Sequence, residues 1–88
     1  MKTVKEEKVG VVEHYFDKIN VAAIKLTSGS LAVGDKIRIK GHTSDFEQAV
    51  ESIQIEHDSV QKADKGADIG VKVSQKAREH DEVFKMVE

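Results

Sequence analysis

The chain has 88 residues, of which 39% are hydrophobic, and a chain of this length buries only about 60% of its unfolded surface, so one small core is expected and a second domain is excluded. It contains no cysteine, which excludes disulfides and cysteine-bound zinc and is typical of the cytoplasmic location that we expect. The formal net charge of −2 argues against an indiscriminate nucleic-acid binder, and no stretch approaches the roughly 18 apolar residues of a membrane span.

The apolar residues are mainly branched at Cβ, with 12 Val and 7 Ile against 2 Leu. Such side chains pack well on a pleated sheet, so the composition predicts an all-β protein. We expect residues 1–7 to be a flexible N-terminal segment and residues 8–88 to form a single domain. Period-two alternation predicts six strands in that domain, at about residues 8–15, 21–26, 36–40, 49–57, 68–73 and 82–87.

The first connections carry turn residues. Residues 17–20 are compatible with a short hairpin connection, and Gly34-Asp35 ends a short apolar entry to the next strand. Residues 41–48 are polar apart from Phe46. Their Ser-Asp-Phe-Glu sequence matches a capping box that could start one helical turn.

The second half of the chain is less regular. Val50 is an odd number of positions from Ile53, so a strand with both on one face needs a bulge near residues 51–52. Residues 58–67 are predicted as a turn or one helical turn, and residues 74–81 as a loop.

For the last strand, the sequence does not decide which side chains face the core, Val83 with Val87 or Phe84 with Met86.

Six short strands could form an open sheet or close on themselves. Closure removes exposed edges and fills the interior with Val and Ile, so we expect a closed six-stranded β-barrel.

Four sequence blocks carry a resemblance to a known family. They are Val-Gly-Val-Val-Glu at 9–13, Leu-Ala-Val-Gly-Asp-Lys-Ile-Arg-Ile at 31–39, Val-Glu-Ser-Ile at 50–53, and Asp-Lys-Gly-Ala-Asp-Ile-Gly-Val-Lys-Val at 64–73. Their order and spacing resemble the six-stranded second domain of translational GTPases such as elongation factor Tu. Residues 43–48 and 52–57 look like hallmarks of the stand-alone translation elongation factor-like proteins, and the chain resembles these proteins more closely.

The resemblance also has limits. A related barrel is appended to collagenase-like peptidase-family proteins, which implies a second kind of partner. No Gly-x-x-x-x-Gly-Lys-Ser/Thr loop is present, so no nucleotide binding or GTP hydrolysis is expected. His80-Asp81 stands where the family usually has Gly-Asp before the last strand.

One strand suggests a basic surface. The first 44 residues hold eight Lys and Arg against five Asp and Glu, whereas the last 44 hold six against eleven. Lys36, Arg38 and Lys40 alternate with Ile and are expected to face outward about 6.6 Å apart, near the spacing of backbone phosphates. The alternative is a solvated face whose lysines discourage edge pairing.

Three further residues could extend an RNA-binding patch. Lys25 could add charge. Tyr15 and Phe16 are adjacent, so one of them must face away from the core, where it would suit base stacking. The alternative is that one closes the end of the barrel and the other covers a loop.

A protein-binding surface is the second candidate site. Phe46 and Gln48 in the polar loop, and Gln54 facing outward between two Ile residues, are its candidate contact residues. The alternatives are that Phe46 pins the loop to the barrel and that Gln54 is merely solvated.

No residue is predicted to be catalytic. His14, His42, His57 and His80 are widely separated and form no close ligand pair, so neither a metal site nor a cofactor is expected. No nucleophile is tied to a histidine by a recognisable motif.

Two hypotheses follow. The first is a non-catalytic binding module that contacts RNA, the ribosome or the wider translation apparatus through the basic strand. The alternative is a protein adaptor or accessory subunit of an enzyme such as a collagenase-like peptidase-family protein.

Overall fold

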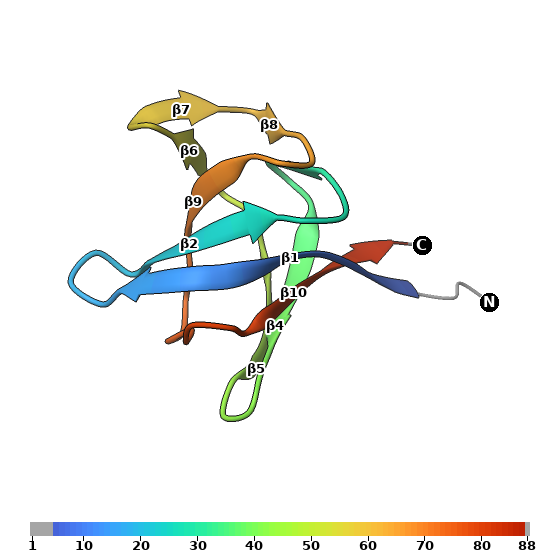
Figure 1. Ribbon diagram of the computed structural model, residues 1–88, viewed down its shortest axis with the longest axis vertical. Coiled ribbons are helices and arrows are strands. Elements are labelled where there is room, and N and C mark those ends of the chain that lie inside the picture. The colour runs from blue at the N-terminus through green and yellow to red at the C-terminus, as the bar shows by residue number, and fades with distance from the viewer. Residues whose placement is uncertain (1–4, 88) are drawn as a thin grey trace.

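The computed structural model describes residues 5–87, which fold entirely into strands and connections (Figure 1). The strands are β1 (Lys5–Phe16), β2 (Val21–Leu26), β3 (Leu31–Ala32), β4 (Lys36–Lys40), β5 (Asp45–Ala49), β6 (Ile53–Ile55), β7 (Asp58–Val60), β8 (Lys62–Ala63), β9 (Asp68–Lys72) and β10 (Glu82–Val87). The prediction of an all-β protein is confirmed. The described part of the chain contains no helix that could span a bilayer.

Eight strands form one antiparallel sheet in the order β5-β4-β10-β1-β2-β9-β6-β7, and β3 pairs with β8 in a separate small sheet. The main sheet is strongly twisted, so that β4 and β5 run steeply across the direction of β1 and β2 (Figure 1). Its end strands β5 and β7 are not neighbours, and over residues 5–87 the ladder stays open. The predicted closed six-stranded barrel is therefore wrong.

The core follows the predicted alternation most clearly in β2. Ala22, Ile24 and Leu26 are completely buried, whereas Lys25 between them reaches the surface. One hydrophobic cluster collects the inward side chains of nearly all the strands. Its fully buried large members are Ile24, Leu26, Leu31, Ile37, Ile39, Ile53, Val12, Val50, Val71 and Val83.

The last strand lies in the middle of the sheet. β10 pairs with β4 on one side and with β1 on the other. Val83 is completely buried, while Phe84 is half-buried on the opposite face, which resolves the inward set that the sequence left open in favour of Val83.

The N-terminal strand starts earlier than the sequence predicts. Residues 1–4 of the expected flexible segment lie outside the described residues, but Lys5, Glu6 and Glu7 pair with β10 as the first rungs of β1. β1 also shifts register twice, between Lys8 and Gly10 and again between Val12 and His14. These bulges bend the strand round the core.

Three strands occupy segments in which only turns were expected. β5 lies in the polar 41–48 segment and its continuation, and β7 and β8 lie within residues 58–67. The bulge expected near residues 51–52 is a full break between β5 and β6. Val50 spans that break with two backbone bonds, donating to the Asp35 carbonyl and accepting from Gly34, both at 2.8 Å.

A side chain links the β5 edge of the sheet to the end of β9. The amide nitrogen of Gln48 donates to the Lys72 carbonyl at 2.9 Å, and its oxygen accepts from the Ser74 backbone nitrogen at 2.7 Å. Elsewhere, Val33 in the segment after β3 donates to the Gln61 carbonyl at 2.9 Å. These contacts and the separate β3–β8 pair hold parts of the curled sheet together where the ladder of the main sheet does not run.

Candidate functional site

The predicted basic strand lies on a face of mixed charge. Arg38 makes two ion pairs, with Glu6 and with Asp45, both at 2.7 Å. Lys36 lies 3.6 Å from Glu47 on the neighbouring strand. The cations therefore point outward as predicted, but acidic side chains of β1 and β5 meet them.

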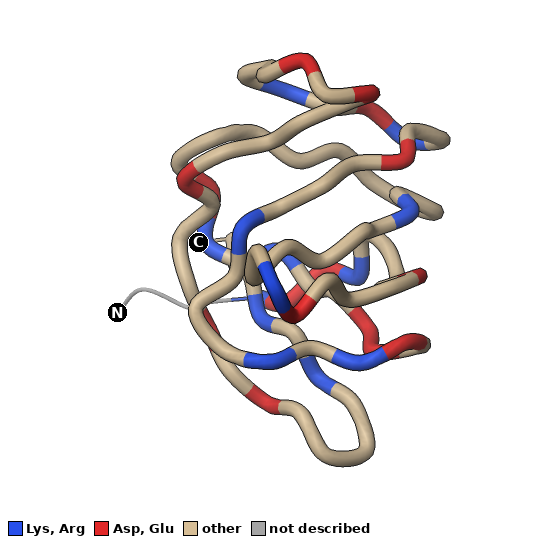
Figure 2. Tube along the Cα trace, turned by 90° about the vertical axis from the view of Figure 1, so that its left-hand side faces the viewer, with Lys and Arg blue, Asp and Glu red and all other residues tan. Residues whose placement is uncertain are grey.

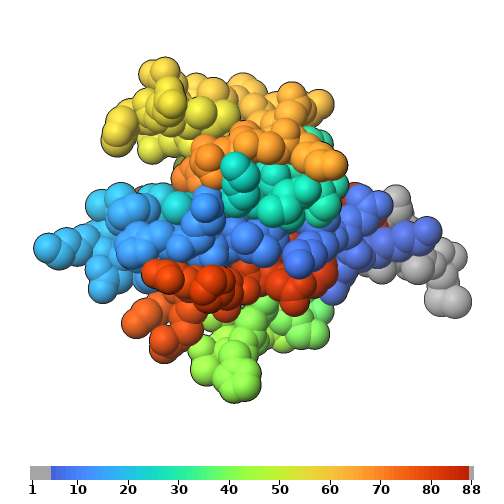
Figure 3. Space-filling model, viewed as in Figure 1, coloured from blue at the N-terminus to red at the C-terminus, as the bar shows by residue number. Residues whose placement is uncertain are grey.

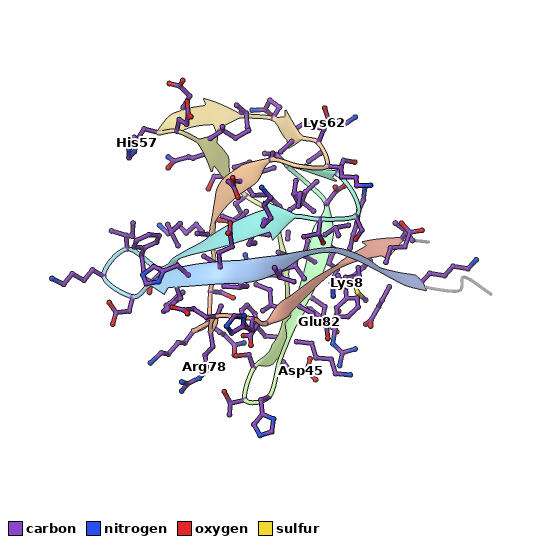
Figure 4. All side chains as sticks on the ribbon, in the orientation of Figure 1. Lys8, Asp45, His57, Lys62, Arg78 and Glu82 are labelled. Carbon is purple, nitrogen blue, oxygen red and sulfur yellow. The ribbon has the colours of Figure 1, made fainter. Side chains whose placement is uncertain are left out.

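The same face continues over β10 and β1. Lys8 pairs with Glu82 at 3.1 Å, and the two side chains lie next to each other in Figure 4. Strand pairing brings together equal numbers of both signs, the cations Lys8, Lys36, Arg38 and Lys40 with the acids Glu6, Asp45, Glu47 and Glu82. Blue and red segments are likewise interspersed along the trace in Figure 2. This face offers no excess positive charge to phosphates.

The pair of Arg38 and Asp45 is the strongest interaction on this face, because two parallel hydrogen bonds of 2.7 and 2.8 Å join the guanidinium to the carboxylate. Hydrogen bonding to Arg38 lowers the pKa of Asp45 from its ordinary value of 3.8. The same bonds raise the pKa of Arg38, so the pair stays ionised.

The other residues proposed for RNA binding are scattered. Lys25 pairs with Asp68 at 3.5 Å, and two strands, β10 and β1, separate its strand from β4. Tyr15 packs half-buried against the core, and its hydroxyl donates to Asn20 at 3.2 Å. Phe16 faces outward with 45% of its surface exposed.

The residues proposed for protein binding do not form one surface either. Phe46 is 6% exposed and belongs to the core cluster, so it pins β5 to the core and cannot meet a partner. Gln48 is committed to the bonds with Lys72 and Ser74. Gln54 alone of the three is an exposed, outward-facing side chain.

Phe16 and Gln54, which the sequence assigned to different sites, line one groove of about 370 Å³. The groove lies on the outer face of β2, β9 and β6. Its floor is low because Ala23 and Gly70 pair there and offer almost no side chain. Figure 3 shows the molecule hollowed between the tip of the β1–β2 hairpin and the β6–β7 turn.

The two walls of the groove differ in character. Phe16 and Ile19 form the hairpin wall and are the exposed large hydrophobic residues of the structure, at 45% and 60%. The ring of Phe16 is held edge-on against His14, with centroids 4.5 Å apart. The opposite wall carries Gln54 with Glu56 and His57 from the β6–β7 turn.

That turn has an unusual backbone. Glu56 and His57 both have positive φ, at 49° and 71°, and they connect the last paired residues of β6 and β7. Two-residue hairpin turns of this kind favour Asn and Gly, because other residues are strained there. The turn nevertheless presents two large polar side chains; Figure 4 shows that of His57.

Asp68 adds a carboxylate to the groove, and Glu13 lies next to it. A hydrogen bond with Asp68, supported by burial and by repulsion between the two carboxylates, raises the pKa of Glu13. Among the described residues that line the groove there are two carboxylates and no Lys or Arg. The groove is therefore apolar at its centre and acidic at its edge.

A second hollow of about 450 Å³ lies between β1 and the 74–81 loop. Its charged lining residues balance, with Asp17 and Glu79 against Lys76 and Arg78. Across residues 5–87, no three His, Asp or Glu side chains gather closely enough to hold a metal ion. The first groove is thus the better candidate for binding.

The sequence could have indicated part of this groove. Phe16 is one of two adjacent aromatic residues, of which one must face away from the core, and Ile19 is an apolar residue inside a predicted turn. Ala23 and Gly70 gave no such signal, because small outward residues become a groove floor only when two strands place them side by side.

No protein-family model matches the chain. The chain is 39% identical over 82 residues to an uncharacterized protease of Methanocaldococcus jannaschii, a match that covers 92% of the chain and 20% of that protein. It is 36% identical over 85 residues to a collagenase of Porphyromonas gingivalis, covering 96% of the chain and 24% of the collagenase. The chain thus spans about a fifth to a quarter of the length of these curated relatives.

The fold is similar to that of the C-terminal domain of a putative U32 peptidase from Geobacillus thermoleovorans. Two crystal structures of that domain match with TM-scores of 0.82 and 0.81, at 20% and 22% identity. The matches cover 88% and 97% of this chain, and 96% and 97% of the domain.

These findings correct the resemblance to the second domain of elongation factor Tu and to translation elongation factor-like proteins. The relatives carry the names of a protease and a collagenase, and the matching structures are domains of a peptidase. The interpretation as an RNA-binding translation protein is wrong.

Proposed function

We propose that this chain is a non-catalytic accessory module of a collagenase-like peptidase-family protein and that it docks on a protein partner through the groove. The observation that carries the proposal is the sequence similarity. Over 92% to 96% of its length, the chain is 36% to 39% identical to a segment of proteins named as a protease and a collagenase.

The groove supports a docking role because it combines features of protein-contact sites. Two large apolar side chains, Phe16 and Ile19, remain exposed on one wall. Exposed apolar patches with a polar edge are typical of interaction surfaces. On the mixed-charge face the large apolar side chains Phe84 and Met86 are half-buried, and Lys8, Lys36 and Arg38 pair with acidic residues.

A chimeric enzyme tests the proposal. In the Porphyromonas gingivalis collagenase, the 85-residue segment that matches this chain would be deleted or replaced by the chain, and gelatin hydrolysis would be measured. We expect deletion to lower the activity, the chimera to recover it, and the chain alone to hydrolyse nothing.

The matched variants separate docking from folding. A chimera with Phe16→Ser and Ile19→Ser should stay close to the deletion, whereas Lys36→Ser with Lys40→Ser on the mixed-charge face should behave like the unmodified chimera. A folded chimera no more active than the deletion, or gelatin hydrolysis by the isolated chain, would contradict the proposal.

A further inference from the structure

We infer that the groove binds a short basic–apolar segment of the partner protein, in which an apolar side chain lies next to a lysine or arginine. This inference rests on the proposed docking function and specifies the chemistry of the bound segment. Within the described chain, the groove is where exposed apolar walls and unbalanced charge occur together.

The apolar half of the argument comes from the shape of the groove. Phe16 and Ile19 are exposed on one wall, and Val21 continues that wall onto β2. The floor at Ala23 and Gly70 lies below them. A volume of about 370 Å³ is at the small end of the roughly 300–1,000 Å³ range of ligand pockets. It suits one or two side chains of a partner better than a large cofactor.

The charged half comes from the edge of the groove. Glu56 and Asp68 are the only Asp, Glu, Lys or Arg residues among the described residues that line the groove, and both are acidic. Lys25 pairs with Asp68 at 3.5 Å, but Glu13 beside it adds another carboxyl group. Lys18 in the hairpin turn and Lys72 on β9 lie outside the lining. The edge therefore attracts a cation and repels phosphates and acidic peptides.

The strained turn is an independent observation that points to the same wall. Glu56 and His57 keep positive φ where Asn and Gly would fit without strain. Strained backbone of this kind concentrates at binding and catalytic sites. The two side chains thus belong to the recognition surface. The strain of positive φ at these residues should make the protein less stable than a variant with Asn and Gly at the same positions.

Three labelled ten-residue peptides in a Gly-Ser background test the inference, with Lys-Leu-Arg, Lys-Ser-Arg or Glu-Leu-Glu at the centre. Binding to the chain would be measured by fluorescence anisotropy and mapped by amide chemical shifts. We expect only the Lys-Leu-Arg peptide to bind below about 2 mM, at least about tenfold tighter than the others. The shifts should concentrate at Ala23, Gln54 and Gly70.

Variants separate binding from stability. Glu56→Gln should weaken binding about two- to fivefold, as expected for an exposed charge pair, whereas Glu47→Gln removes an equal charge from the mixed-charge face and should leave it unchanged. Phe16→Ser should weaken peptide binding about tenfold or more. The double variant E56N/H57G should melt at a higher temperature than the parent and yet bind more weakly.

Several results would overturn the inference. They are equal or tighter binding of the Glu-Leu-Glu peptide, no Lys-Leu-Arg binding by folded protein, shifts that concentrate on β4, and concentration-dependent self-association through the groove. If the Lys-Leu-Arg peptide does not bind but the chimera is active, only this inference is contradicted. Peptide binding with an inactive chimera would remove the peptidase assignment and leave the groove chemistry intact.

Discussion

His80 and Gly34 occupy the same position in two similar turns. Each has positive φ, 73° for His80 and 98° for Gly34, and each is followed by an aspartate that comes directly before a strand, β10 or β4. In both turns the aspartate accepts a 2.9 Å bond from the backbone nitrogen three residues earlier. The structure thus shows why a Gly-Asp pair suits this site, and that His80 bears the conformational cost.

His80→Gly should therefore stabilise the protein. Relief of the left-handed conformation, worth roughly 1–2 kcal/mol, outweighs the greater flexibility of glycine in the unfolded chain, so a net gain of about 0.5–1 kcal/mol is expected. Urea unfolding measures it. The matched change Gly34→Ala should act in the opposite direction, and a destabilised His80→Gly protein would contradict the argument.

Gly10 is required for a different reason, close approach of two strands. Any Cβ at this position would overlap the Lys25 backbone carbonyl across the β1–β2 pair. Gly10→Ala should lower the free energy of unfolding by about 1–3 kcal/mol, since backbone cannot move aside as a side chain can. Thermal unfolding tests this, and an unchanged melting temperature would show that β1 relaxes at its bulge.

The pair of Arg38 and Asp45 makes a prediction about pH. Because the pKa of Asp45 is lowered on folding, the pair stabilises the protein above pH 3.8 and loses its effect as pH falls through the lower folded value. Carboxyl carbon NMR titration should place the Asp45 midpoint below 3.8. Arg38→Gln should raise it most and Lys40→Gln less, while Lys36→Gln should leave it in place.

At the level of elements, strands with a two-sided pattern could be predicted from sequence. The bounds 21–26, 36–40 and 82–87 agree with β2, β4 and β10. β2 and β4 place apolar side chains at alternate positions against the core, whereas in β10 only Val83 is buried and Lys85 follows it on the same face. The hairpin connection at 17–20 is confirmed too.

β5 could not be predicted in this way, because its inward positions are not all apolar. Phe46 is the one apolar inward residue of the strand, and Ser44 and Gln48 flank it on the same side. β5 lies at the end of the sheet, and the Gln48 side chain joins it there to Lys72 and Ser74 at the end of β9, a junction that we call the seam. An end strand can carry polar inward groups when they form hydrogen bonds of this kind. Alternation alone therefore places this segment in a loop.

Gln48 offers the test of that seam. Gln48→Ala removes the bonds to Lys72 and Ser74 and should cost about 0.5–1.5 kcal/mol. The Ser74 amide should then exchange with solvent markedly faster. Gln54→Ala, on an exposed glutamine, is the matched control and should change neither stability nor Ser74 exchange. Equal protection of Ser74 in both variants would mean that the seam is held by other contacts.

At the scale of the whole molecule, the charge of the face around β4 could not be predicted from the sequence, because charge balance is a property of the assembled sheet. The cations of β4 occupy alternate positions of a single strand, but Glu6, Asp45 and Glu82 reach them from three other strands. The groove shows the same dependence, since its walls come from residues about 40 positions apart. Its candidate residues could be picked out individually, but not their grouping.

The position of β10 makes the whole fold depend on its last residues. β10 separates β4 and β5 from the other five strands of the sheet, and Val83 is completely buried. Deleting residues 82–88 would expose two strand edges and open the core. Since small domains have only about 5–15 kcal/mol of stability in total, we expect this truncation to unfold the chain.

The groove should disappear with the fold, although β10 does not line it, because β2, β9 and β6 have no independent core. The truncated chain should lose the dispersion of its amide NMR spectrum and bind no Lys-Leu-Arg peptide. Deleting only residues 87–88 removes a single rung, Lys5 with Val87, and should preserve both properties. A dispersed spectrum from the longer truncation would show that the strands on the groove side form a separate folding unit.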